Sequence, residues 1–224
     1  MTLDDDRAAL FRKYGELIAE GNRRFNLTSV TAPDEVAVRH FADSLALCRT
    51  LDIHGKTIAD VGAGAGLPGL ALKIYDPTVR LTAIDSTAKK VDFIRETAAT
   101  LGLPGVACVA GRAEELGQDP EFRERFDLVT ARAVTKLCAL AELCLPLARV
   151  GGCMCALKTA DGAEDELREG ERSIATLGGR LREMYGYELP GLGMRCAAVI
   201  IEKVRPTPAP YPRRWAKIIA RMGK

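Results

Sequence analysis

The clearest chemical signal in the chain is a glycine-rich run of ten residues from Asp60 to Gly69, D-V-G-A-G-A-G-L-P-G, directly after a short apolar stretch. Glycines permit a tight turn and let a ligand approach the backbone closely. A helix that begins here offers free N–H groups and a partial positive field. Asp85 lies 23 residues after Gly62, at the end of the next predicted strand, where a carboxylate can accept both hydroxyls of a ribose. Together these residues predict a site for a cofactor that contains adenosine.

Two cofactors fit this description. Gly64, Gly66 and Gly69 match the dinucleotide fingerprint G-x-G-x-x-G, so a nicotinamide enzyme is one interpretation. Pro68 argues against it, because proline removes one of the amides that a pyrophosphate would bind. A nicotinamide enzyme also needs a second lobe for the hydride acceptor, for which this chain has no room. The leading Asp60-x-Gly62-x-Gly64 is the form used for S-adenosylmethionine, which we favour.

Alternating strands and helices are predicted around these residues. The alternation is typical of a doubly wound sheet with parallel strands. A hairpin predicted at its end, across a turn rich in Gly and Pro, adds an antiparallel edge. The expected fold is therefore α/β, a Rossmann-like sheet that is mostly parallel with an antiparallel edge. Apolar patterning indicates strands at 57–61, 79–84, 106–110, 126–131, 153–157, 180–187 and 196–204, and helices at 67–75, 87–101 and 134–147.

Three segments are expected along the chain. Helical spacing predicts an amphipathic helix over 4–21, and Pro33 begins a second helix. These helices make an N-terminal segment, 1–54, that packs on a cofactor-binding core, 55–204. The tail, 205–224, starts with alternating prolines, which predict an extended chain held away from the sheet.

The composition excludes several classes of protein. Apolar residues make up 47% of the chain and charged residues 28%, which is unlike a disordered, collagen-like or disulfide-stapled protein. No apolar run reaches the roughly 18 residues of a membrane span. The N-terminus, MTLDDDRAAL, is acidic where a signal peptide would be basic. We therefore expect a cytoplasmic protein that makes no membrane contact.

The seven cysteines and two histidines do not form a metal-binding pattern. No C-x-x-C pair is present, and the histidines are His40 and His54. Small buried thiols in a reducing compartment explain the cysteines better than a zinc site or a disulfide. We expect no structural metal.

The charge is unevenly distributed. Residues 203–224 contain seven basic side chains and no acidic one, leaving the rest of the chain with 25 basic and 30 acidic residues. A basic tail on a mildly acidic body indicates a polyanionic partner. Short basic tails are also often merely solvated, so the tail alone does not decide the partner.

Several motifs beyond the glycine run carry a specific resemblance. Ahead of it stand Asn26-Leu27-Thr28-Ser29 and Arg39-His40-Phe41-Ala42-Asp43-Ser44-Leu45. With these, the chain resembles the RsmG (GidB) family from about residue 20 to 214. The later matching segments are Asp85-Ser86, Lys89-Lys90, Gly111-Arg112-Ala113-Glu114-Glu115, Ala131-Arg132-Ala133 and Ala156-Leu157-Lys158.

The resemblance implies a class I methyltransferase that uses S-adenosylmethionine. Its expected substrate is N7 of one guanine in the decoding-region loop of bacterial 16S ribosomal RNA, as free RNA or in the small ribosomal subunit. We expect the enzyme to be a monomer. Position by position, the resemblance places cofactor contacts at Gly62, Leu67, Ala113, Glu114 and Arg132, beside the Gly64 and Asp85 expected from the glycine run.

The expected chemistry requires no general base. Guanine N7 carries a lone pair and no proton, so catalysis depends on aligning N7 with the methyl group. No catalytic base is therefore assigned. Asn26, Arg39 and His40 are expected to form a substrate-facing wall, although His40 could equally be a buried histidine bonded to Asp43. Arg132 could likewise be a structural ion-pair partner. Lys158 is expected to contact phosphate or the guanine O6 edge, and Arg213 and Arg214 to contact RNA.

Two other functions are compatible with parts of the sequence. A methyltransferase of the same fold acting on a small molecule or a protein would share residues 57–158, but would have no need of the two N-terminal motifs or the basic tail. A non-catalytic ribosome-binding factor would not need an intact glycine loop with Asp85.

Overall fold

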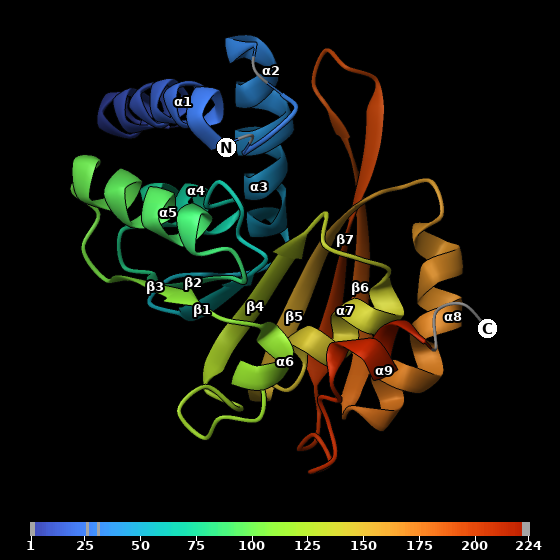
Figure 1. Cartoon of the computed structure of the whole chain (residues 1–224). Coiled ribbons are helices and arrows are strands. Elements are labelled where there is room, and N and C mark those ends of the chain that lie inside the picture. The colour runs from blue at the N-terminus through green and yellow to red at the C-terminus, as the bar shows by residue number, and fades with distance from the viewer. Residues whose placement is uncertain (1–2, 26, 31, 221–224) are drawn as a thin grey trace.

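A single seven-stranded sheet organises the computed structural model, which describes residues 3–25, 27–30 and 32–220 (Figure 1). The strands are β1 (Thr57–Val61), β2 (Arg80–Asp85), β3 (Val106–Ala110), β4 (Phe126–Arg132), β5 (Ala148–Thr159), β6 (Gly179–Leu189) and β7 (Met194–Lys203). They lie in the order β3-β2-β1-β4-β5-β7-β6. The pairings from β3 to β5 are parallel, whereas β7 is antiparallel to both β5 and β6. The predicted fold class is confirmed.

The helices alternate with the strands as the sequence indicates. They are α1 (Asp5–Phe25), α2 (Pro33–Val36), the π-helix η1 (Ala37–Ala42), α3 (Asp43–Leu45), the 3-10 helix η2 (Ala46–Arg49), α4 (Gly69–Tyr75), α5 (Ala88–Thr100), α6 (Ala113–Leu116), α7 (Leu137–Cys144), α8 (Ala163–Thr176) and α9 (Trp215–Ile219). No helix was predicted where α8 lies, although its buried residues, Ala163, Gly170 and Ile174, recur at helical spacing. None of the helices in the described part of the chain has the length and apolar character needed to cross a membrane.

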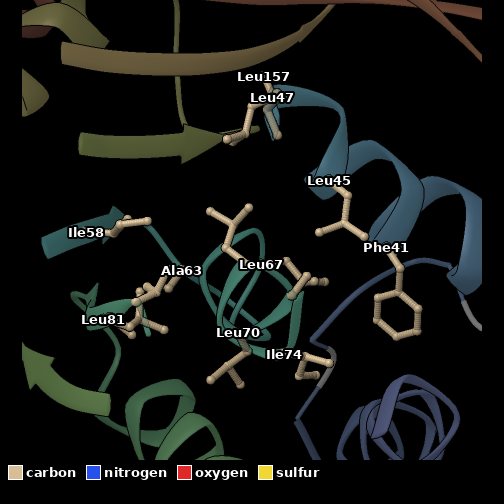
Figure 2. Close-up of a cluster of buried hydrophobic side chains, with 14 of the residues drawn as sticks. Phe41, Leu45, Leu47, Ile58, Ala63, Leu67, Leu70, Ile74, Leu81 and Leu157 are labelled. Carbon is tan, nitrogen blue, oxygen red and sulfur yellow. The ribbon is translucent and has the colours of Figure 1, made fainter. Parts of the chain in front are cut away.

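The two faces of the sheet bury separate apolar clusters. Alternate residues of a strand point to opposite faces. On β4, Leu128 joins the cluster beneath α1, α4 and α5, while Val129 joins the one beneath α7 and α8. Figure 2 shows Leu67 and Leu70 between the strand residue Ile58 and the helical segment that carries Phe41. Residues on either side of the glycine run thus anchor it to the core.

The N-terminal helix braces the glycine run directly. Tyr14 on α1 is fully buried, and its hydroxyl donates to the carbonyl of Ala65 over 2.8 Å. The Tyr14 ring also stacks on Phe41, with ring centroids 5.2 Å apart. The pKa of Tyr14 is raised because burial disfavours the phenolate. This donor therefore stays protonated at any working pH.

The second N-terminal helix contains a π-turn. The Asp43 amide donates to the carbonyl of Val38, five residues back, so the segment from Pro33 to Arg49 runs through one wide turn before ending as a 3-10 helix. Val36 and Phe41, also five residues apart, are both buried. The wide turn brings these two apolar side chains into the core together.

The C-terminal tail differs from the prediction. It was expected to run extended and away from the sheet, but Thr207 and Ile218 are buried against the body, and α9 lies beside α7 (Figure 1). The physical reason is that prolines leave backbone carbonyls unpaired within the segment. Side chains of the body donate to those carbonyls, as they do to Thr207 and Tyr211.

Candidate cofactor and substrate site

A cleft of about 650 Å³ lies where the carboxyl ends of β1, β4 and β5 meet. The chain leaves β1 toward β2 on one side, while β4 lies on the other, so the order of strands reverses here. Open α/β sheets bind ligands at such a switch point, and the volume suits a small-molecule site. The cleft is lined by these residues predicted from the sequence: Gly62, Gly64, Leu67, Arg39, His40, Arg132 and Lys158.

The glycine run forms one wall of the cleft. Gly62, Gly64 and Gly66 all have positive φ, at 70°, 58° and 93°, a conformation that other residues adopt only at a cost. A Cβ on Gly62 would lie 2.6 Å from a methyl group of Val134, in the loop after β4. The loops after β1 and β4 are therefore in close contact at Gly62, and any larger residue there would force Val134 to shift.

Asp85 fixes the glycine run from the end of β2. Its Oδ2 accepts from the Gly64 amide over 3.0 Å, and its Oδ1 accepts from the Thr87 amide over 2.9 Å. Asp85 is buried and lies outside the cleft lining. Each carboxylate oxygen keeps a lone pair beyond these contacts, so the ribose contact stays a prediction. The structure adds a second role, that of shaping the loop.

Asp60 fixes the same run from within the core. It is wholly buried, and its Oδ2 accepts from the Gly69 amide over 2.8 Å while Thr130 donates to Oδ1 over 3.0 Å. Burial raises the pKa of this carboxyl to about 6. Asp60 therefore stabilises the start of α4 and does not face the cleft.

Ala113 and Glu114 begin the single turn of α6, which follows β3, the strand next to β2. Both are buried and lie outside the cleft lining. The Glu114 carboxylate accepts from Nε of Arg112 over 2.6 Å. The Gly111 amide, just before them, donates to the Asp85 carbonyl over 3.0 Å. The adenine contact predicted here stays a prediction.

Arg132, at the end of β4, connects the cleft to the N-terminal motifs. One terminal nitrogen donates to the carbonyl of Arg39 over 3.0 Å and to Asp43 Oδ2 over 3.1 Å. The other lies 3.4 Å from Nδ1 of His40. The side chains of Arg132 and Asp43 are 15% and 11% exposed, so this pair is held in a poorly solvated place. Arg132 is thus an ion-pair partner that also lines the cleft.

His40 is a neutral acceptor in this network. Arg132 can only donate, so Nδ1 of His40 accepts, and Nε2 carries the proton toward Thr28 Oγ1, 2.9 Å away. Burial and the neighbouring Arg132 charge lower the pKa of His40 to about 4. The alternative of a histidine bonded to Asp43 is not what the contacts show, because His40 bonds Thr28 and Arg132.

We expect the His40 ring to titrate with a midpoint near pH 4 in the folded protein, followed by NMR of its carbon-bound protons. Unfolded histidine titrates near 6.5, so between pH 6.5 and 4 the unfolded chain takes up a proton that the folded chain does not. The free energy of unfolding should therefore fall by about 3 kcal/mol as the pH drops through this window. A His40→Gln variant should lose this part of the pH dependence. A folded-state midpoint near 6.5 would contradict the assignment.

Lys158 is also paired within the protein. Its ammonium lies 2.6 Å from Oε2 of Glu166 on α8 and donates to the Thr135 carbonyl over 2.8 Å. Glu166 in turn accepts from the Leu137 amide over 2.7 Å, at the start of α7. An ammonium has three donors, so one remains for a ligand in the cleft. Glu166 was not predicted, because it lies on α8, where no helix was expected.

The π-turn η1 directs Arg39 and His40 into the cleft. Single π-turns inside helices occur frequently at functional sites. Nε of Arg39 is buried and has no hydrogen-bond partner among the residues described, which is costly for a charged donor group. The orphaned donor marks this wall as a place where a ligand group would be stabilised.

Tyr187 also belongs to the hydrogen-bond network around Asp43, and it was not predicted from the sequence. Its hydroxyl, on β6, donates to Asp43 Oδ1 over 2.6 Å, so Asp43 bridges Tyr187 and Arg132. Burial and the Asp43 charge raise the pKa of Tyr187 far above its ordinary value. A tyrosine in an exposed hairpin strand has no local pattern that predicts such a contact.

The remaining predicted residues lie elsewhere. Arg213 pairs with the buried Glu142 of α7, with a shortest N–O distance of 2.7 Å, whereas Arg214 is exposed. Both are on the α7 side of the sheet, away from the cleft lining. Asn26 lies outside the described residues. Within the described part of the chain, no cluster of three or more His, Cys, Asp or Glu side chains could hold a metal.

The cleft fits the adenosine cofactor that the sequence predicts. A Cβ on Gly64 would meet only the Gly62 carbonyl within 4 Å, at 3.8 Å, so the backbone of the run faces open space. The orphaned Arg39 donor and the charged groups of Arg132 and Asp43 lie across this space. A ligand with both a carboxylate and an ammonium, such as the methionine part of S-adenosylmethionine, finds partners for both charges here.

Structural neighbours support the fold. A SAM-dependent methyltransferase from Aquifex aeolicus superposes with a TM-score of 0.58 at 18% identity, covering 83% of this chain and 98% of that one. A ribosomal protein L11 methylase from Lactobacillus delbrueckii superposes with a TM-score of 0.53 at 19% identity, covering 73% and 77%. At such identities the likeness concerns the fold, which is that of class I methyltransferases.

Sequence relatives are much closer. The ribosomal RNA small subunit methyltransferase G of Exiguobacterium sibiricum is 47% identical over 215 residues, 96% of this chain and 90% of the relative. The enzyme of the same name from Deinococcus radiodurans is 48% identical, covering 91% and 81%. The family model GidB, described as rRNA small subunit methyltransferase G, matches residues 7–189. With its glycine run, its Arg39–His40 wall and its fold, this chain belongs to the rRNA small subunit methyltransferase G family, whose cofactor is S-adenosylmethionine.

Proposed function

We propose that this chain transfers the methyl group of S-adenosylmethionine to N7 of one guanine in the decoding-region loop of 16S ribosomal RNA. We further propose that it acts in the cytoplasm, as a monomer, on free RNA or on the small ribosomal subunit. The observation that carries the proposal is that the glycine run and the residues Arg39, His40 and Arg132 line the same cleft. Membership in a methyltransferase family removes the nicotinamide interpretation of that run.

The cofactor side of the site is proposed residue by residue. The methionine end of the cofactor would lie against the backbone of Gly62, Gly64 and Leu67. Asp85 would accept hydrogen bonds from the ribose hydroxyls. Ala113 and Glu114 would contact the edge of the adenine. Arg132 would bind the carboxylate of the cofactor. Bound in this way, the cofactor supplies an electrophilic methyl group on a positively charged sulfur.

The protein's own contribution to the reaction is alignment. N7 of guanine attacks with its lone pair, so no side chain has to remove a proton, and the neutral state of His40 fits this requirement. Arg39 and His40, with Asn26, would orient the base, and Lys158 would approach its O6 edge or a phosphate. Correct placement of a reacting atom can contribute several orders of magnitude in rate.

The acceptor is tested by methyl transfer from labelled cofactor to 16S RNA or small subunits that lack the modification, with chemical cleavage to map N7-methylguanine. We expect one modified guanine in the decoding-region loop. Cofactor binding without any RNA methylation would instead favour the alternative, an acceptor that is a small molecule or a protein.

Arg214 offers a separate test of RNA contact. It is exposed, so an Arg214→Ala variant should weaken RNA binding, and it should lower the slope of log affinity against log salt by about one unit for one lost phosphate contact. Arg214→Lys should restore most of the slope. Binding should be measured by filter retention between low and moderate salt. An unchanged slope would remove Arg214 from the interface.

A further inference from the structure

The C-terminal residues 204–220, here called the strap, are fastened to the body by buried polar contacts. Lys203, at the end of β7, is fully buried, and its ammonium donates to Thr207 Oγ1 over 2.6 Å. The Thr207 amide donates to Glu124 over 2.7 Å, and its hydroxyl donates to the Leu177 carbonyl over 2.9 Å. A solvated basic tail would not bury such groups, because each needs a partner once it leaves water.

The strap is also fastened to the end of α6. One nitrogen of Arg123 donates both to the Gly117 carbonyl, just after α6, and to the Tyr211 carbonyl of the strap, each over 2.7 Å. The Gln118 side chain donates to the Pro212 carbonyl over 2.9 Å. A Cβ on Gly117 would lie 2.8 Å from the Pro212 ring, so strap and helix end are in direct contact.

Arg213 anchors the middle of the strap to α7. Its backbone amide and Nε both donate to Glu142 Oε1 over 2.8 Å, and a terminal nitrogen donates to Oε2 over 2.7 Å. The Glu142 side chain is only 4% exposed. Removing one partner of such a pair leaves a buried charge without compensation, which is strongly unfavourable.

Helix α6 depends on tertiary contacts such as these for its position. α6 is only four residues long, Ala113–Leu116, and a single helical turn is not stable without tertiary contacts. Its first two residues are Ala113 and Glu114, where the proposed function places the adenine. The fastening at Gly117 and Gln118 follows within one further turn.

We propose that the strap positions α6 and thereby sets the affinity for the adenosine part of the cofactor, with Arg123 and Arg213 as positioning residues. The inference rests on the proposed adenine contact at Glu114. It gives Arg213 a task different from the RNA contact expected from the sequence. Arg214, its exposed neighbour, is left as the RNA-facing member of the pair.

The test measures cofactor affinity by calorimetry, at a temperature well below the unfolding midpoint of every variant. Arg213→Ala should weaken S-adenosylmethionine binding about tenfold, the equivalent of about 1.4 kcal/mol, and Arg213→Lys should recover part of this loss. Gln118→Ala, a milder change at an exposed side chain, should weaken binding by a smaller factor. In steady state the KM for the cofactor should rise, while kcat and the KM for RNA stay within twofold.

The matched control is Arg180→Ala, which removes an exposed arginine–carboxylate pair with Glu202 on the edge of the sheet. It should leave cofactor affinity unchanged. Glu114→Gln tests the premise and should weaken cofactor binding, and its effect should not add to that of Arg213→Ala if both act through α6.

The outcomes separate the two ideas. If Glu114→Gln weakens binding while Arg213→Ala and Gln118→Ala do not, the strap inference is overturned and the adenine placement stands. If Glu114→Gln has no effect, the adenine placement is wrong, and the strap inference falls with it. Loss of binding in all three variants, with the Arg180 control intact, supports both.

Discussion

An aspartate in place of Gly62 should weaken S-adenosylmethionine binding by at least about 100-fold, or roughly 3 kcal/mol, and should abolish methyl transfer. Any Cβ at this position would lie 2.6 Å from a methyl group of Val134, so the Val134 side chain, in the loop after β4, would have to shift. The positive φ of 70° adds backbone strain for a residue that is not glycine. The shifted Val134 and the added carboxylate would disturb the cleft in which the cofactor is proposed to lie.

Gly55 provides the matched control for this change. It has a similar φ of 65°, but nothing lies within 4 Å of its Cβ position, and it precedes β1 at the opposite end from the cleft. Gly55→Asp should therefore lower the free energy of unfolding by about 1 kcal/mol and leave cofactor binding intact. Calorimetric titration and urea unfolding of both variants check this. Normal binding by Gly62→Asp would show that the glycine run does not hold the cofactor.

Methionine in place of Arg132 should have the second large effect. Methyl transfer should fall at least about 100-fold, because the side chain that connects β4 to Arg39, His40 and Asp43 is lost. The stability of the fold should also fall, by about 3 kcal/mol, since Asp43 keeps its charge in a poorly solvated place without its cation. Urea unfolding and steady-state kinetics measure the two effects separately.

A second substitution separates structure from function at Arg132. Asp43→Asn keeps an acceptor for the Tyr187 hydroxyl but removes the negative charge, so the Asp43→Asn, Arg132→Met double variant should recover much of the lost stability. It should not recover activity, because the contact to the substrate-facing wall is still missing. A double variant that regains both would reduce Arg132 to an ion-pair partner.

Most of the sheet was predictable because its strands are short stretches rich in apolar residues that alternate with predicted helices, even where, as in β3, no residue is fully buried. The strands at 57–61 and 106–110 have the predicted bounds. β5 begins at Ala148, five residues before its predicted start, because Ala148 pairs with Phe126 and residues 149–152 then bulge out before Cys153 pairs with Leu128. Such pairing depends on the neighbouring strand and leaves no apolar signature.

The parts of the site that a sequence motif positions through the backbone were predictable. Contacts between side chains from distant parts of the chain were not. Gly62 and Arg132 were expected at the carboxyl edge of the sheet because parallel strands end together there. The pairing of Lys158 with Glu166, and of Arg213 with Glu142, joins elements with no recognisable link along the chain. The basic tail shows the same limit. Its charge can be read from the sequence, but the pairing of Arg213 with the buried carboxylate of Glu142 cannot.

The π-turn at Ala37–Ala42 makes this segment far more sensitive to insertions and deletions than to substitutions. An α-helix advances by about 100° per residue, so losing one residue here would restore regular helical hydrogen bonding while rotating everything before it by that angle. The shortened helix would be well formed, yet Val36 and Phe41 could no longer share the core while His40 faces Arg132. In the divergence of related chains, the length of this segment should therefore be under stricter selection than the identity of its exposed residues.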